Sequence, residues 1–223
     1  MELILAKEAN GIFASKGKLY FYDKVHRFFE YDFNTKNEID PEEYFKLRFG
    51  SAYRAVLKHY GLSTSLSLLS GILEDGSVIT HFFQNSWFYK FNNEGKMVWK
   101  TEKIGNFDTV YAIAIERNSI WCAFPTNHTI KRYSLETFEE EVSIGDEEPW
   151  SFKAEVFDHP EDVYINRDTL YVSDMGNKRV CKVDLKTYEV TEYLKFNEHV
   201  WGYMVCGGRE LVFLDSGVYV LDN

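Results

Sequence analysis

The chain has 223 residues, of which 45% are hydrophobic and 17% aromatic, and its formal net charge is −10. This apolar content is enough for a packed core, and the abundance of aromatic side chains favours β-sheet. The acidic balance argues against nucleic acid or an anionic membrane as a partner, because binding to either rests on basic surface.

The N-terminal segment Met1–Glu8 has no basic start, no long apolar core and no cleavage site, so we expect no signal peptide and a cytoplasmic protein. No apolar run approaches the ~20 residues that a membrane-spanning helix needs. Cys122, Cys181 and Cys206 lie in apolar runs without a CxxC pair. This pattern predicts buried free thiols rather than disulfides.

A pattern of four short strands recurs along the chain. Its most regular mark is an apolar residue that follows a polar or glycine pair, at Leu19, Val78, Ile120, Leu170 and Leu211. Further strand positions lie before and after each mark, and turns that begin with Asp, Asn or Ser separate the third strand from the fourth. A four-stranded meander of about 42 residues, repeated in this way, is typical of a β-propeller blade.

The segment 40–61 interrupts this period between the first and second repeats and is predicted to be helical. Asp40 suits the N-cap, Pro41 the first helical position and Gly61 the end. Gly50 and Ser51 mark a point where the helix can kink or split. One apolar stripe runs along it, formed by Phe45, Phe49, Tyr53, Val56 and Tyr60. We expect this stripe to pack on the propeller face and plug the channel, and docking of another subunit is the alternative.

A second insertion lies within residues 145–158 and contains Pro149 and Trp150. In an antiparallel meander, the connections between repeats, the turns between the second and third strands and the starts of the first strands share one face. Both insertions are connections between repeats. We therefore expect the helix and this loop on the face where the central channel opens, where binding groups usually lie.

The last repeat ends at Asn223 without a fourth strand, whereas residues 2–6 form a strand that belongs to no repeat. We expect residues 2–6 to pair with the strand around Val218–Leu221, because this closes the ring and leaves no open sheet edge. The predicted architecture is an all-β, five-bladed propeller over residues 1–223 as one domain, with 40–61 as a helical insertion, and we expect a monomer.

The segment Leu170–Val180, with the sequence LYVSDMGNKRV, resembles the NHL repeat, and the segment 126–137 is similar to it. The segment 26–35 is a weaker match, and the repeats at 68–101 and 201–223 lack the signature. The resemblance implies a β-propeller. NHL propellers usually have six blades, whereas five repeats occur here, and the family includes both interaction modules and enzymes.

Polar residues at the starts of the first strands form the candidate site. Asp108, Asp158 and His199 are assigned to the same position in three repeats. The expected ligand-binding residues at the channel mouth are Asp108, Thr109, Trp150, Asp158, His159, His199 and Trp201. The alternative is that these polar groups cap strand ends and that Trp201 belongs to the core. The remaining histidines, His26, His59, His81 and His128, are expected to be turn or surface residues.

Two functions fit this pattern. The first is a non-catalytic module, without a cofactor, that binds a protein, a peptide or a small polar ligand. The alternative is a metal-dependent hydrolase or lyase with a metal at the channel mouth, held by residues drawn from His159, His199, Asp108 and Asp158. The sequence has no HxxxH pair, Gly-rich phosphate loop or GxSxG nucleophile motif, and this favours the binding module.

Overall fold

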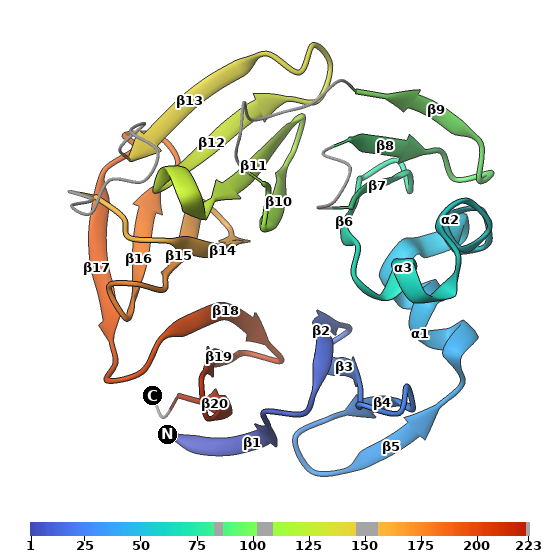
Figure 1. Ribbon diagram of the computed structural model, residues 1–223, viewed down its shortest axis with the longest axis horizontal. Helices are drawn as coiled ribbons and strands as arrows, with labels where there is room; N and C mark the ends of the chain where they lie inside the picture. Colours follow the sequence, from blue (N-terminus) through green and yellow to red (C-terminus); the bar gives the residue numbers. More distant parts are fainter. Residues whose placement is uncertain (83–86, 102–108, 146–155, 222–223) are drawn as a thin grey trace.

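The computed structural model describes residues 1–82, 87–101, 109–145 and 156–221. Five antiparallel sheets of four strands each stand around a ring, which is the arrangement of a five-bladed β-propeller (Figure 1). We number the blades 1 to 5 in chain order. In each blade the first strand lies next to the central channel and the last strand on the outside. The predicted fold class is confirmed.

The strands of each blade follow one another along the chain, except in blade 5. Blade 1 consists of β2 (Asn10–Ser15), β3 (Lys18–Tyr22), β4 (Phe28–Tyr31) and β5 (Lys36–Ile39). Blade 2 consists of β6 (Leu69–Ile72), β7 (Val78–His81), β8 (Phe88–Phe91) and β9 (Met97–Lys100). Blade 3 consists of β10 (Ala112–Glu116), β11 (Ser119–Phe124), β12 (Thr129–Ser134) and β13 (Glu140–Gly145). Blade 4 consists of β14 (Pro160–Asn166), β15 (Thr169–Asp174), β16 (Arg179–Asp184) and β17 (Val190–Lys195). Blade 5 consists of β18 (Val200–Cys206), β19 (Arg209–Leu214), β20 (Gly217–Val220) and β1 (Glu2–Ala6).

The N-terminal strand supplies the outer strand of blade 5. Strand β1 pairs antiparallel with β20, from Glu2 opposite Val220 to Ala6 opposite Gly217, with a bulge between Leu3 and Leu5. Leu5 is buried together with Leu19, Phe21 and other residues of blades 1 and 5. The predicted closure of the ring by residues 2–6 is confirmed.

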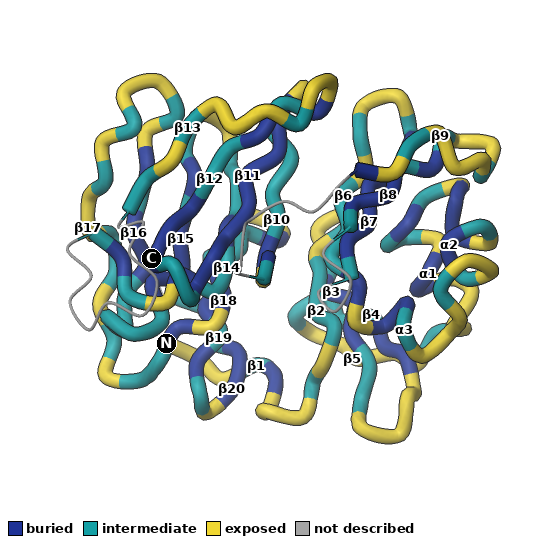
Figure 2. The backbone as a smooth tube through the Cα atoms, turned by 45° about the horizontal axis from the view of Figure 1, so that its top comes forward, coloured by how far each residue is buried: buried dark blue, intermediate teal, exposed yellow. Residues whose placement is uncertain are grey.

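The core of each blade is built on its middle strands. Strand β11 is buried at every position, and the second strands of the other blades are also among the most buried parts of the chain (Figure 2). Cys122, Cys181 and Cys206 are free and buried, as predicted. Among the described residues, no helix combines the length and the apolar character that crossing a membrane requires.

The predicted helical insertion 40–61 forms two short helices, α1 (Pro41–Phe49) and α2 (Tyr53–Tyr60), and a third, α3 (Leu62–Leu66), follows beyond its predicted end. The Asp40 carboxylate accepts a hydrogen bond from the backbone N–H of Glu42 at 2.7 Å, as expected of an N-cap. The helix splits at Gly50. Its φ of 58° is readily adopted by glycine but is unfavourable for other residues.

The helices fill the space between blades 1 and 2 instead of covering the channel (Figure 1). Phe45, Phe49 and Val56 are buried in one cluster with Phe28 of blade 1 and Phe91 of blade 2. At the junction between α1 and α2, the Ser51 hydroxyl donates a hydrogen bond to the backbone carbonyl of Asn93. Asn93 lies in the turn between the last two strands of blade 2. The expectation that the stripe plugs the channel is therefore wrong. Aromatic side chains on this helix bury more surface between two sheets than over an open channel.

The closure of the ring can be tested with two leucines of β1. Leu5 is 7% exposed and Leu3 is 52% exposed. Replacing Leu5 with Ala should lower the free energy of unfolding by about 2–4 kcal/mol, because it leaves a cavity under the closing strand. Leu3→Ala should change it by less than about 0.5 kcal/mol. Urea denaturation measures both, and equal losses in the two variants would contradict this seating of β1.

Candidate functional site

The face on which the inner strands begin is the face to which the turns between second and third strands also return. We call it the mouth face, and it includes the start of β14 at His159 and the turn between β11 and β12 at His128. Neighbouring blades contribute side chains to it side by side, so a group on this face can be assembled from two blades.

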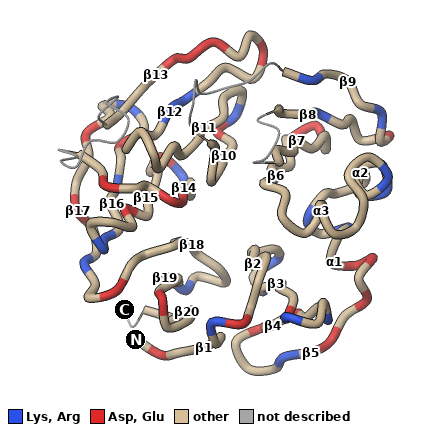
Figure 3. The backbone as a smooth tube through the Cα atoms, viewed as in Figure 1, with Lys and Arg blue, Asp and Glu red and all other residues tan. Residues whose placement is uncertain are grey.

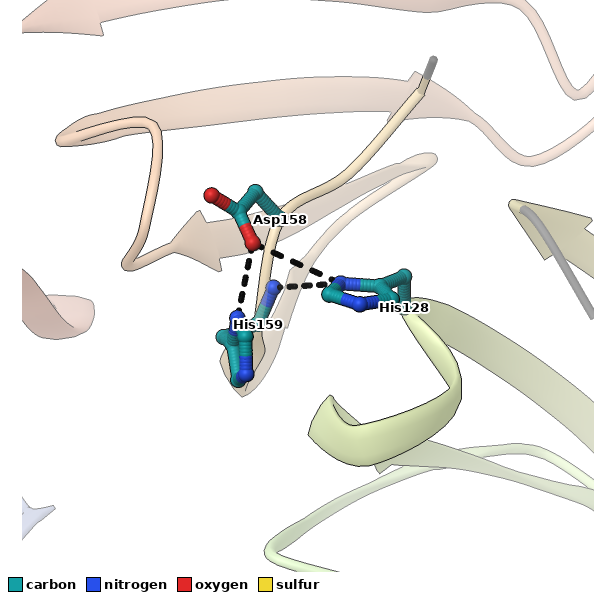
Figure 4. A group of neighbouring side chains, drawn as sticks. All are labelled: His128, Asp158 and His159. Atoms are coloured by element: carbon teal, nitrogen blue, oxygen red, sulfur yellow. Dashed lines mark hydrogen bonds and ion pairs between the residues drawn. The ribbon is translucent and has the colours of Figure 1, made fainter. Parts of the chain in front are cut away.

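Blades 3 and 4 bring His128, Asp158 and His159 together on the mouth face (Figure 4). The Asp158 Oδ1 atom lies 2.7 Å from His159 Nδ1 and 3.5 Å from His128 Nδ1. The backbone N–H of His159 donates a hydrogen bond to His128 Nδ1 at 3.2 Å. The His128 ring is buried, whereas the side chains of Asp158 and His159 are part-exposed. The group is thus fixed from one side and open on the other.

A buried framework holds Asp158 in place. Its backbone N–H donates to Asp174 Oδ1 at 2.6 Å, and Asp174 is fully buried. Burial raises the pKa of Asp174, against the opposing effect of its hydrogen bonds, which include one from Arg179 Nε at 2.7 Å. At Gly176, a Cβ atom would overlap the Asp158 carboxyl group, so glycine is required there. A site held by such a framework is preorganised, so the positions of its side chains should change little when a ligand binds.

His128 was expected to be an ordinary turn or surface residue, and that expectation is only half right. It lies in a turn, with φ of 55°, but is 2% exposed. His159 also has positive φ, 51°, which is uncommon for residues other than glycine. The signal that could have found His128 is topological, because a turn between second and third strands must meet the start of the next blade. His81 differs from expectation too, since it is buried on β7, and burial lowers its pKa to about 4.

The structure does not bring His199 to this group. His199 Nδ1 instead bonds Asp215 Oδ2 at 3.0 Å, and the indole N–H of Trp201 donates to Asp215 Oδ1 at 2.7 Å. Hydrogen bonds from Trp201 and then His199 lower the pKa of Asp215. Of the other predicted site residues, Thr109 is part-buried before β10, and Asp108 and Trp150 lie outside the described residues.

Strand pairing also changes which residues are equivalent. Pro160 pairs with Asp174 in blade 4, and Val200 pairs with Leu214 in blade 5, at the starts of hairpins of the same length. His159 is therefore equivalent to His199, one position away from the predicted match between Asp158 and His199. The predicted match is wrong by one residue because it aligned Leu170 with Leu211, whereas strand pairing makes Leu170 equivalent to Glu210.

Two aromatic side chains at the starts of inner strands are exposed. In β18 the register shifts between Val200 and Gly202, so no residue of β19 stands opposite Trp201, and the Trp201 side chain is 46% exposed. Tyr111, directly before the first paired residue of β10, is 50% exposed. Within the described ranges, these are the only exposed Phe, Tyr or Trp residues, and the others are buried or half-buried. The expectation that Trp201 belongs to the core is wrong, because a bulge re-aims the side chain.

The central channel forms a cavity of about 430 Å³ between the inner strands of blades 1 to 4 and α1. Its lining combines apolar side chains, such as Ile12, Leu69 and Ile113, with Tyr111 and with the polar groups of Ser15, Arg48, Ser70 and Asp162. A larger hollow of about 640 Å³ lies outside the ring beside α1, but it is lined almost wholly by charged side chains. The channel is the better ligand site, because it offers apolar side chains together with polar groups, whereas the hollow beside α1 offers mainly charged ones.

Asp162 is the acidic residue of β14 that lines this channel. Its Oδ2 accepts a hydrogen bond from the backbone N–H of Tyr203 at 3.3 Å. Burial raises the pKa of Asp162 to about 6, although hydrogen bonds from the backbone N–H groups of Tyr203 and Val163 act in the opposite direction. The desolvation of the carboxylate therefore outweighs the hydrogen bonds that stabilise its charge.

The structure resembles those of other β-propellers. It matches a streptogramin B lyase with a TM-score of 0.51 and 15% identity, over 98% of this chain and 70% of that chain. Virginiamycin B lyase from Staphylococcus aureus gives a TM-score of 0.51 and 13% identity, over 96% and 69%. A protein of unknown function from Bacteroides caccae gives 0.54 and 11%, over 94% and 71%. Identities this low show a shared fold and nothing more.

No protein-family model matches the chain, and no curated protein matches it either. The β-propeller part of the predicted resemblance is confirmed by the fold and its neighbours, whereas membership of the NHL family is not.

Asp162 gives a prediction for stability against pH. Its pKa of about 6 in the fold lies above the value of about 3.9 in an unfolded chain, so ionisation destabilises the fold. The stability of the protonated form is fully present below about pH 4 and is lost as pH rises through about 6. Asp162→Asn should therefore raise the free energy of unfolding by about 1–3 kcal/mol at pH 8 and by less than about 1 kcal/mol near pH 4.5.

Urea denaturation at both pH values measures the difference. Asp168→Asn is the control, because Asp168 is an exposed carboxylate in the turn between β14 and β15 of the same blade. A loss of stability in Asp162→Asn at pH 8 would contradict the picture of an unpaired, desolvated carboxylate.

Proposed function

We propose that this chain is a non-catalytic binding module that takes its ligand on the mouth face, at the entrance to the channel. The observation that carries the proposal is the exposure of Tyr111 and Trp201. They are the exposed aromatic residues of the described chain, and both lie at the start of an inner strand. Exposed aromatic side chains on a rigid scaffold are favoured contacts in binding sites.

Polar side chains beside these aromatic residues are a second reason to place ligand binding on the mouth face. Trp201 is held by Asp215, which also bonds His199, and the hollow beside them measures about 280 Å³. The His128, Asp158 and His159 group offers further hydrogen-bonding atoms on blades 3 and 4. A small polar ligand, or a peptide with an aromatic or charged side chain, fits these surroundings better than an extended apolar surface does.

The proposal predicts where ligands bind. In an amide chemical-shift screen of a library of small polar molecules, shifts should gather at residues 109–112, 158–162 and 199–202. Trp201→Ala and Tyr111→Ala should each weaken the hits by about tenfold, because aromatic anchors contribute most to such contacts. Met97→Ala on β9 is the matched control, since Met97 is an exposed residue on an outer strand. Shifts confined to turns on the opposite face, such as those at Gly17 and Asn93, would contradict the proposal.

A second candidate is a metal-dependent enzyme, and the His128, Asp158 and His159 group is the observation that favours it. One ligand atom from each of these residues lies within 4.8 Å of the others. Two imidazoles and a carboxylate suit Zn²⁺ and related ions. An ion here would replace two existing hydrogen bonds, from His159 Nδ1 to Asp158 and from the His159 amide to His128.

Zinc binding by the purified protein tests this candidate. Titration against a fluorescent chelator should show one Zn²⁺ per chain, and His159→Ala should weaken the affinity at least about tenfold. His199→Ala is the matched control, because His199 also bonds a part-exposed Asp through Nδ1 but has no third ligand among the described residues. Absence of zinc binding, or equal losses in both variants, would remove the metal-dependent candidate.

A further inference from the structure

We infer that the central channel binds a small organic cation, a molecule with an ammonium or amidinium group on an apolar body, and that Asp162 is its counter-ion. The inference rests on the proposed function and names the class of ligand that the channel takes. Three independent features carry it, which are the size of the cavity, the charges on the inner strands and the surroundings of Asp162.

The cavity has room for a small molecule, and its lining offers apolar side chains and an aromatic ring. Its volume is about 430 Å³, within the range of pockets for small ligands. The side chains of Ile12, Leu69 and Ile113 supply apolar surface from three blades. Tyr111 adds an aromatic ring at the entrance, a group that attracts organic cations.

The inner strands carry no basic residue. Their sequences are NGIFAS in β2, LSGI in β6, AIAIE in β10, PEDVYIN in β14 and VWGYMVC in β18. The charged residues among them are Glu116, Glu161 and Asp162, all acidic, and β14 is marked as acidic in Figure 3. Glu116 is paired with Arg132 and faces away from the lining of the channel. The inner wall of the ring is therefore negative at Asp162.

Arg48 of α1 is the cation that lines the cavity, but its guanidinium is already engaged. It donates to the backbone carbonyls of Leu66 and Leu68 and to the Tyr44 hydroxyl. The effects on the pKa of Asp162 come from burial and two backbone N–H groups, with no contribution from Arg48. Arg48 thus ties the helices to blade 2 and does not neutralise Asp162.

In lacking a charged partner, Asp162 differs from Asp174, the buried carboxylate of the same blade. Asp174 is compensated by Arg179 and Asn177, as buried charges usually are. No described Lys, Arg or His forms an ion pair with Asp162. A desolvated carboxylate that lines a cavity and forms no ion pair is a binding group for a cation that arrives with the ligand.

The test compares two probes of equal size, benzylammonium and benzyl alcohol, by amide chemical-shift titration at about pH 7.5, where a carboxyl of this pKa is ionised. Benzylammonium should bind at least about tenfold more tightly than benzyl alcohol and should shift the amides around Asp162 and Tyr111. Asp162→Asn should reduce the preference to less than about threefold. Asp168→Asn is the matched control and should retain the full preference, because Asp168 is an exposed carboxylate in the turn between β14 and β15 and does not line the channel.

The inference is overturned if neither probe binds, if both bind equally, or if Asp162→Asn keeps the preference for the ammonium. Its failure can be told from failure of the proposed function. Hits from the polar library that map to Trp201 and Tyr111, without a preference for cations, would contradict the inference alone. Hits that map to the opposite face would contradict both.

Discussion

The close approach of the inner strands around the channel is the constraint on which the rest of this structure depends. Gly71 of β6 shows how tight it is, because a Cβ atom there would collide with Ile115 of β10 in the next blade. Where two inner strands approach this closely, only one of them has room for a side chain at the contact, and β1 completes the last sheet of the closed ring. Between blades 1 and 2 the aromatic helices α1 and α2 complete the packing that a neighbouring sheet supplies elsewhere.

This constraint also decides where polar groups can stand. Within the ring a charge loses its water, so Asp174 is held by Arg179 and Glu116 by Arg132. The Asp162 carboxylate accepts hydrogen bonds only from backbone N–H groups. These do not offset the loss of water around its charge, and its pKa is therefore raised. Residues that destabilise a fold are often the residues that serve binding, because natural stability is traded against function at such sites. The bulge that exposes Trp201 is a second feature that lowers stability at the proposed site, since it interrupts a ladder of hydrogen bonds.

Much of the fold could be predicted from the sequence because its signals are local and periodic. The marks from Leu19 to Leu211 repeat with the blades, Asp40 and Gly61 bound the helical insertion, and the missing fourth strand pointed to residues 2–6. The burial of individual side chains was harder to predict. His128 is in a turn yet buried, and Trp201 is in a strand yet exposed, because neighbouring blades and a one-residue bulge decide these outcomes. The position of the helices between two blades likewise depends on contacts with Phe28 and Phe91, which no local pattern encodes.

A crystal structure of the protein grown with benzylammonium would test the binding role of the channel most directly. We expect density for the ligand inside the ring, with its nitrogen within hydrogen-bonding distance of the Asp162 carboxylate and its ring against the apolar wall near Tyr111. Density at the turns around Gly17 or Asn93, with a channel that holds only water at the same ligand concentration, would contradict it.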